Sequence, residues 1–311
     1  MNTLRQTLND YLSLRLAMGF KLSEAQRLLP RFIDFLEHQK AEFITTDLAV
    51  KWATESHTVQ PAEWAKYLSL VRVFSRFCSS IDPRTEIPPI GLLPFHPHRA
   101  SPYIYSDNEI KQLLQAAGQL YSPTGLRAHT YVTVFGLLAV TGMRISELVS
   151  LENKDVNIAQ AELTIRDTKF GKSRWLPLHP TTQQVLHQYA LKRDHQYPVP
   201  YSSRFFVSET GAGLVSCTVR ATFIKLSRKI GLRGIEDSHG PRLHDFRHRF
   251  AVQTLLRWYQ DGADVDQHLP ELSTYLGHVK VSDTYWYLTA TPQLLQLALQ
   301  RSELRLQEER A

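Results

Sequence analysis

Two short segments place arginine and histidine side chains where they could bind a phosphate. TGMRISEL carries Arg144 shortly after a glycine, and HDFRHRFA carries His244 and Arg247 three residues apart. On a helix, residues three apart share a face. A guanidinium is a rigid fork of donors that matches phosphate oxygens. Each segment alone is weak evidence, because an arginine near a glutamate is usually a surface ion pair.

His244 also has a second histidine, His248, four residues later, which suggests a metal site as an alternative. A zinc site of this type needs a third ligand and usually a nearby acid. The glutamate of an HExxH helix is missing, since Asp245 and Phe246 follow His244. The metal hypothesis is therefore the weaker one for this segment.

Two lysines lie in a predicted turn between strands. The segment TKFGKSRWLPL contains Lys169 and Lys172. Lysines in turns are usually only solvated, but a lysine can also supply a proton to a departing oxygen.

A later segment, LGHVKVSDTYWYL, combines a histidine with two tyrosines. His278 follows a glycine at a predicted helix boundary, and Tyr287 lies nine residues later, with Tyr285 as its competitor. Tyrosines in such a context usually pack half-buried, yet a tyrosine hydroxyl can also be a covalent nucleophile.

Together, two arginines, two histidines, one lysine and one tyrosine describe a phosphoryl-transfer site that works without a metal. Arginines can neutralise a phosphate whose charge rises in the transition state. A lysine or histidine can protonate the leaving oxygen. The joint pattern is far more specific than any of its parts.

With these residues in this order, the chain resembles the tyrosine recombinase (phage integrase) family, strongly over the second domain and loosely over the first. The matches are the R-x-S-E-L signature, the hairpin lysine eight residues before Pro177, the H-x-x-R pair, the LGH histidine and the tyrosine nine residues beyond it. Spacing favours Tyr287 over Tyr285 and Lys169 over Lys172. The six matched residues are Arg144, Lys169, His244, Arg247, His278 and Tyr287.

The resemblance implies a mainly α protein of two domains. An N-terminal four-helix, SAM-like core-binding domain would bind DNA, and a C-terminal α+β catalytic domain would carry a small antiparallel sheet. The implied activity is site-specific cleavage and rejoining of double-stranded DNA through a 3′-phosphotyrosyl intermediate, with no cofactor and no metal. The implied assembly is a homo-oligomer, four subunits on two duplexes. The tyrosine's context is more similar to integrases of mobile elements than to chromosomal Xer proteins.

The resemblance also implies a role for each matched residue. The tyrosine attacks, and the two arginines hold the non-bridging oxygens. Lys169 would protonate the leaving 5′ oxygen, His244 would assist proton transfer at the nucleophile, and His278 would donate to the phosphate. Glu147 would orient part of the site. Two other functions stay open: strand relaxation like that of a type IB topoisomerase, and DNA binding without cleavage.

The elements that must position these residues are mostly helices. Residues 1–80 are predicted to form four of them: about 3–17, one starting at a Ser23/Gln26 capping box, one after Thr46, and one from Pro61 to Cys78. On the last helix Arg72 and Arg76 lie off the apolar face. They are candidate DNA contacts, as is Lys172.

A linker is predicted at 81–102, which contains six prolines. The catalytic domain, 103–311, opens with a Ser106/Glu109 capping box and an apolar helix over about 128–141. The only strand signals are ELTIRDT and RWLPL. The remaining predicted helices span about 217–230, 242–258, 267–276, 281–288 and 292–309.

The tail helix, 292–309, has an apolar stripe of Leu294, Leu295, Ala298, Leu299 and Leu306, with Leu297 and Leu304 outside it. The family resemblance favours contact with a neighbouring subunit. The alternative is that the stripe folds back onto its own domain.

Charge and cysteine content fit an intracellular DNA-binding protein. The net charge is +6, of which residues 1–98 contribute only +1. The first residues, MNTLRQTLND, have no apolar signal-peptide core, and the two cysteines form no disulfide framework. We therefore expect a cytoplasmic, nucleoid-associated protein.

Overall fold

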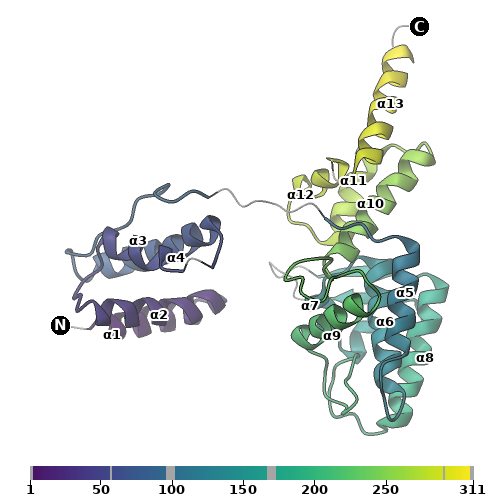
Figure 1. Cartoon of the computed structure of the whole chain (residues 1–311), viewed down its shortest axis with the longest axis horizontal. Coiled ribbons are helices and arrows are strands. Elements are labelled where there is room, and N and C mark those ends of the chain that lie inside the picture. The colour runs from purple at the N-terminus through teal and green to yellow at the C-terminus, as the bar shows by residue number, and fades with distance from the viewer. Residues whose placement is uncertain (1–2, 57, 96–101, 167–172, 290, 309–311) are drawn as a thin grey trace. The chain divides into compact units, whose positions relative to one another are not determined.

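The computed structural model describes residues 3–56, 58–95, 102–166, 173–289 and 291–308. The chain divides into two compact units, Met1–Ala100 and Ser101–Ala311 (Figure 1). Both are mainly helical, and the second contains a small antiparallel sheet. The predicted fold class is confirmed.

The first unit is built from four helices that bury one apolar core. The helices are α1 (Leu4–Ala17), α2 (Ser23–His38), α3 (Thr46–Thr54) and α4 (Pro61–Ser79). Phe32, Val71 and Phe74 are fully buried at its centre. The predicted capping box at Ser23 is wrong: Leu22 occupies the N-cap, and no side chain caps the helix.

The first part of the proline-rich segment packs on this unit. Arg72 on α4 donates from Nε to the carbonyl of Pro88 at 2.6 Å and from Nη2 to that of Pro89 at 2.8 Å. Leu93 packs against the helical core. Because proline lacks an N–H, such a segment offers mainly carbonyls to its neighbours. Arg72 thus holds this segment, whereas Arg76 is exposed.

The second unit begins with the predicted capping box, in which Ser106 and Glu109 bond reciprocally. No helix within the described ranges is long and apolar enough to cross a membrane. In Figure 1, α5, α6 and α8 run side by side. Helix α8 and the short α7 were not predicted. The helices are α5 (Asp107–Gly118), α6 (Leu126–Thr141), α7 (Ile145–Ser150), α8 (Pro180–Gln196), α9 (Ser216–Lys229), α10 (Asp245–Gln260), α11 (Val265–Leu276), α12 (Ser282–Tyr285) and α13 (Pro292–Glu308), with 3-10 turns η1 (Asn153–Asp155) and η2 (Trp286–Thr289).

The sheet has three antiparallel strands in the order β1 (Val156–Asn157), β2 (Glu162–Ile165) and β3 (Arg174–Pro177). The two predicted strands pair in register, Leu163 opposite Leu176 and Ile165 opposite Arg174. Leucine and isoleucine side chains of β2 and β3 enter the core, so the alternating pattern correctly identified the buried face.

Helix α13 does not present its predicted stripe as one surface. Leu294 is fully buried in a core cluster with Tyr287, and Leu297 packs partly against that cluster. Leu295 and Leu299 are exposed. Figure 1 shows the helix leading away from α10 and α11. The grouping of Leu294 with Leu295 and Leu299 is therefore wrong, because the helix packs on its own unit through the Leu294–Leu297 side.

Candidate active site

Arg144 stands at the sharp junction between α6 and α7. Gly142 ends α6 with φ +60°, and a Cβ there would lie 2.8 Å from the ring of Phe250, so glycine is required. Arg144 then occupies the N-cap of α7. Its Nη1 donates to Glu147 at 2.7 Å, and its Nη2 donates to the carbonyl of Gly277 at 3.2 Å. The turn at Gly142 thus places Arg144 beside the end of α11.

Glu147 is a buried carboxylate shared by two arginines. Besides Arg144 it accepts Nη1 and Nη2 of Arg174 at 3.1 and 2.8 Å. Burial opposes ionisation, but the hydrogen bonds and charge of Arg174, with the hydrogen bonds of Arg144, hold the pKa of Glu147 below its usual value. The carboxylate is therefore charged at neutral pH. The expectation that Glu147 orients part of the site fits these contacts, whereas Arg174 was missed.

Arg247 lies in the first turn of α10 and is 1 % exposed. Its Nη1 donates to the carbonyl of Gly142 at 3.1 Å, and its Nη2 donates to that of Leu276. Burial, followed by the charge of Arg144, lowers the pKa of Arg247 to about 10. Arg247 therefore stays protonated at pH 7. Its two hydrogen bonds join Gly142, two residues before Arg144, to Leu276, two residues before His278.

Both candidate histidines are neutral in the DNA-free site. Burial, followed by the charge of Arg247, lowers the pKa of His244 and of His278 to about 4. Nδ1 of His278 is 2.8 Å from the hydroxyl of Thr284, which is fully buried. A bound phosphate would oppose this shift, because an anion favours the charged imidazole.

Tyr287 is 2 % exposed and lies among histidines, whereas Tyr285 is 48 % exposed. The ring of Tyr287 stacks on His278, with centroids 6.2 Å apart and planes 15° apart. The ring of His248 is 5.5 Å away. Sequence patterns had suggested His248 only as a metal ligand. The spacing of the segment did not reveal that it would face the tyrosine.

Five of the six matched residues are described, and they lie in one region, linked by short contacts and mutual electrostatic influence. The sixth, Lys169, and the neighbouring Lys172 lie outside the described residues. Arg72 and Arg76 belong to the first unit. In the described parts of the chain, no three His, Cys, Asp or Glu side chains gather as a metal site. Two guanidinium groups, two neutral imidazoles and a tyrosine hydroxyl are the groups needed to bind a phosphodiester and attack its phosphorus. Because Arg247 and Tyr287 are almost fully buried here, DNA must uncover both before they can react.

The chain is similar to known proteins in both sequence and fold. Residues 104–293 match the model of the phage integrase family. An integrase/recombinase-type protein of Sinorhizobium fredii (y4rB) is 48 % identical, over 99 % of both chains. Tyrosine recombinase XerD of Xanthomonas axonopodis is 28 % identical over 79 % of this chain and 77 % of that one. The Tn1549 transposon integrase, solved with transposon end DNA, has a similar fold, with a TM-score of 0.66 at 16 % identity, covering 96 % and 99 % of the two chains.

Proposed function

The chain belongs to the phage integrase family, and from that premise we propose that Tyr287 is the residue with which it cuts DNA. Members of this family break and rejoin DNA strands, and the chain is a site-specific recombinase of the tyrosine type. The residue assignment rests on the stacking of the buried Tyr287 ring on His278. Arg144 and Arg247 bind the carbonyls of Gly277 and Leu276, the two residues that precede His278.

In the proposed reaction the Tyr287 hydroxyl attacks the scissile phosphorus as the bond to the 5′ oxygen breaks. Arg144 and Arg247 hold the non-bridging oxygens, whose charge rises. His244, neutral before DNA binds, takes the tyrosine proton, and Lys169 supplies the proton to the leaving oxygen. The phosphodiester energy is kept in the 3′-phosphotyrosyl bond, so a 5′-hydroxyl of another strand can reverse the step without ATP, cofactor or metal.

The proposed partner is double-stranded DNA carrying specific recombination sites, bound by four copies of the chain. We assign the enzyme to mobile-element integration, since its identity to integrase/recombinase-type proteins exceeds its identity to XerD. Such an enzyme would work in the cytoplasm, at the nucleoid.

A suicide DNA substrate, incubated with the protein in EDTA, tests this proposal. Its cleaved fragment diffuses away, so the covalent complex accumulates. We expect covalent capture of this substrate. We also expect strand exchange between two copies of the recombination site of the mobile element that encodes the protein. Relaxation of supercoiled plasmid without exchange would indicate topoisomerase activity instead. Binding without capture would indicate a DNA-binding factor.

Lys169 is predicted to act on the leaving group. Lys169→Ala should slow cleavage of ordinary DNA by about 10²–10⁴-fold. A substrate with sulfur at the 5′-bridging position should be cut nearly as fast as by the unchanged chain, because a thiolate departs without a proton. Lys172→Ala is the matched control. As a candidate DNA contact it is expected to lower DNA affinity, but at saturating protein it should cut both substrates at the normal rate. Equal defects of Lys169→Ala on both substrates would assign the acid to another residue.

The exposed side of α13 is predicted to bind a neighbouring subunit. Leu295→Glu combined with Leu299→Glu should leave folding and single-site DNA binding intact and weaken cooperative binding to paired sites, as native gels can measure. Leu294→Ala is the contrasting variant: Leu294 is fully buried, so it should cost about 2–5 kcal/mol of stability. Normal cooperative assembly of the double variant would show that the tail serves only its own subunit. Deleting residues 292–311 would not separate these effects, because it would remove both the exposed leucines and the buried Leu294.

A further inference from the structure

We propose that Arg174 is a positioning residue for catalysis, which aligns Arg144 and His278 without touching the DNA. This inference rests on the proposed function, since it concerns the same site. It arises from the contacts of Arg174 itself.

The guanidinium of Arg174 is held on three sides by its own chain. Its side chain is 9 % exposed. Nη1 and Nη2 form a fork on the two oxygens of Glu147, and Nε donates to the carbonyl of Tyr275 at 2.7 Å. A forked pair fixes direction as well as distance. Three of its five N–H groups therefore donate to the protein itself. These contacts indicate that Arg174 holds neighbouring site residues in place.

The partners of Arg174 lead directly to two proposed catalytic residues. Glu147 binds Arg144, and Arg144 donates to the carbonyl of Gly277. A Cβ on Gly277 would lie 2.7 Å from Nη1 of Arg174, and its φ is +67°. The guanidinium therefore packs on bare backbone immediately before His278. Arg174, Glu147, Arg144 and Gly277 form a closed ring of contacts.

The contacts of Arg174 cross-link three elements that also pack in the same core cluster. Arg174 begins β3, Glu147 lies in α7, and Tyr275 lies in the last turn of α11. Carbonyls of a last helical turn lack partners within the helix, and a cation satisfies them well. Without Arg174, Glu147 would keep only Arg144 among its partners in the described part of the chain, and the carbonyl of Tyr275 at the end of α11 would lose its hydrogen bond from β3.

Arg174→Ala should therefore lower the rate of covalent capture by roughly 100-fold, the scale expected for a misplacement of about 1 Å. Affinity for single-site DNA should stay near that of the unchanged chain. Arg174→Lys keeps a charge beside Glu147 but cannot form the fork, so its rate should be intermediate. If the alanine variant fails to fold, the lysine variant supports the same comparisons.

A second substrate separates positioning from general loss of structure. In this DNA a methyl group replaces one non-bridging oxygen of the scissile phosphate, which removes its charge. Arg144 then has little charge to neutralise, so the defect of Arg174→Ala should be much smaller on this DNA than on ordinary DNA, and the part that remains reflects the displaced His278. A merely structural defect would lower both rates equally.

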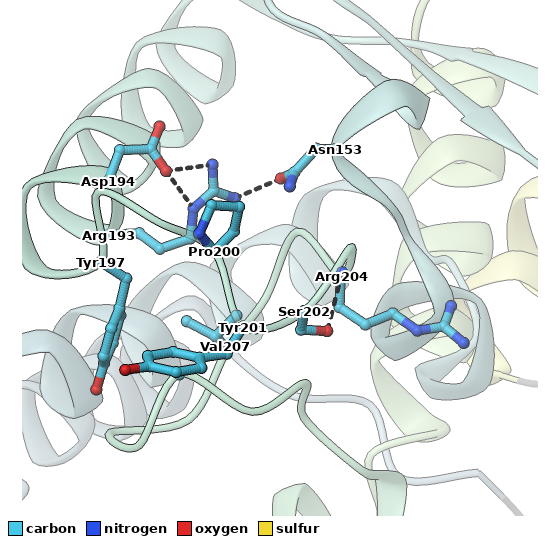
Figure 2. A pocket seen from close by; sticks show the side chains of 10 residues that line it. Asn153, Arg193, Asp194, Tyr197, Pro200, Tyr201, Ser202, Arg204 and Val207 are labelled. Carbon is cyan, nitrogen blue, oxygen red and sulfur yellow. Dashed lines mark hydrogen bonds and ion pairs between the residues drawn. The ribbon is translucent and has the colours of Figure 1, made fainter.

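Arg193 supplies a matched control in the same unit. Figure 2 shows it bonded to Asp194 and Asn153. It also donates to the carbonyl of Phe205, and its side chain is 11 % exposed. Arg193→Ala should lose stability comparable to that lost by Arg174→Ala but retain the capture rate per folded molecule.

Three outcomes would overturn the proposal: normal capture by Arg174→Ala, an equal defect on charged and uncharged phosphates, or an equal loss of capture in Arg193→Ala. Failure of the unchanged chain to form any covalent complex would instead reject the proposed function, so the two failures are distinguishable.

Discussion

Replacing Tyr287 with phenylalanine should abolish covalent capture of DNA while leaving DNA affinity close to that of the unchanged chain. The ring of Tyr287 is buried beside His278 and His248. Phenylalanine keeps the ring and removes only the hydroxyl, so the fold should lose about 1 kcal/mol or less. Capture on a suicide substrate, measured with gel-shift affinity on intact DNA, checks both parts.

Tyr285→Phe is the matched control, because Tyr285 lies two residues away and is half-exposed. It should capture DNA at the normal rate. The assignment is wrong if Tyr285→Phe eliminates capture and Tyr287→Phe does not.

Arg247→Ala should reduce the capture rate by about 10²–10³-fold, the loss typical of removing one donor that stabilises transition-state charge. Arg247 also binds the carbonyls of Gly142 and Leu276, so the variant should lose about 1–3 kcal/mol of stability from their unsatisfied burial. Arg247→Lys should remain strongly impaired, since one ammonium cannot reproduce the fork. Single-turnover capture with a thermal unfolding curve separates these effects.

Arg249 is the control for this helix. It lies two residues further along α10 and donates to the carbonyl of Tyr105 at 2.8 Å, with Asp107 as its ion-pair partner. Arg249→Ala should lose some stability but little rate per folded molecule. Arg247 would be excluded from the phosphate clamp if both variants lost the same rate, or if Arg247→Ala lost less than roughly tenfold.

Local patterns predicted the elements with strong periodicity or clear caps. The Ser106 capping box and the alternation of ELTI and RWLP both hold, because their hydrogen bonds and side-chain faces are decided locally. Helix α8 was missed because its apolar residues do not gather on one stripe, although Pro180 at its first turn was a start signal. Ser23 failed as a cap because it is already the first residue of the helix, and Leu22 occupies the N-cap position.

The order and spacing of the reactive residues predicted the site. The sequence did not predict which residues hold them in place. Arg174 gave no signal of its own, since its partners Glu147 and Tyr275 are 27 and 101 residues away. His248 was visible, but its contact with Tyr287 depends on how η2 packs on α10. The predicted α13 stripe is not buried as one surface, because the helix packs on its own unit through Leu294 and Leu297 and leaves Leu295 and Leu299 exposed.

The central claim, that Tyr287 is the attacking residue, is tested most directly by mapping the protein–DNA bond. The captured complex would be digested with nuclease and protease, and the nucleotide-bearing peptide sequenced by tandem mass spectrometry. Fragmentation resolves Tyr285 from Tyr287 within one peptide. We expect the nucleotide phosphate on Tyr287; its presence on Tyr285 or on any other residue would contradict the account.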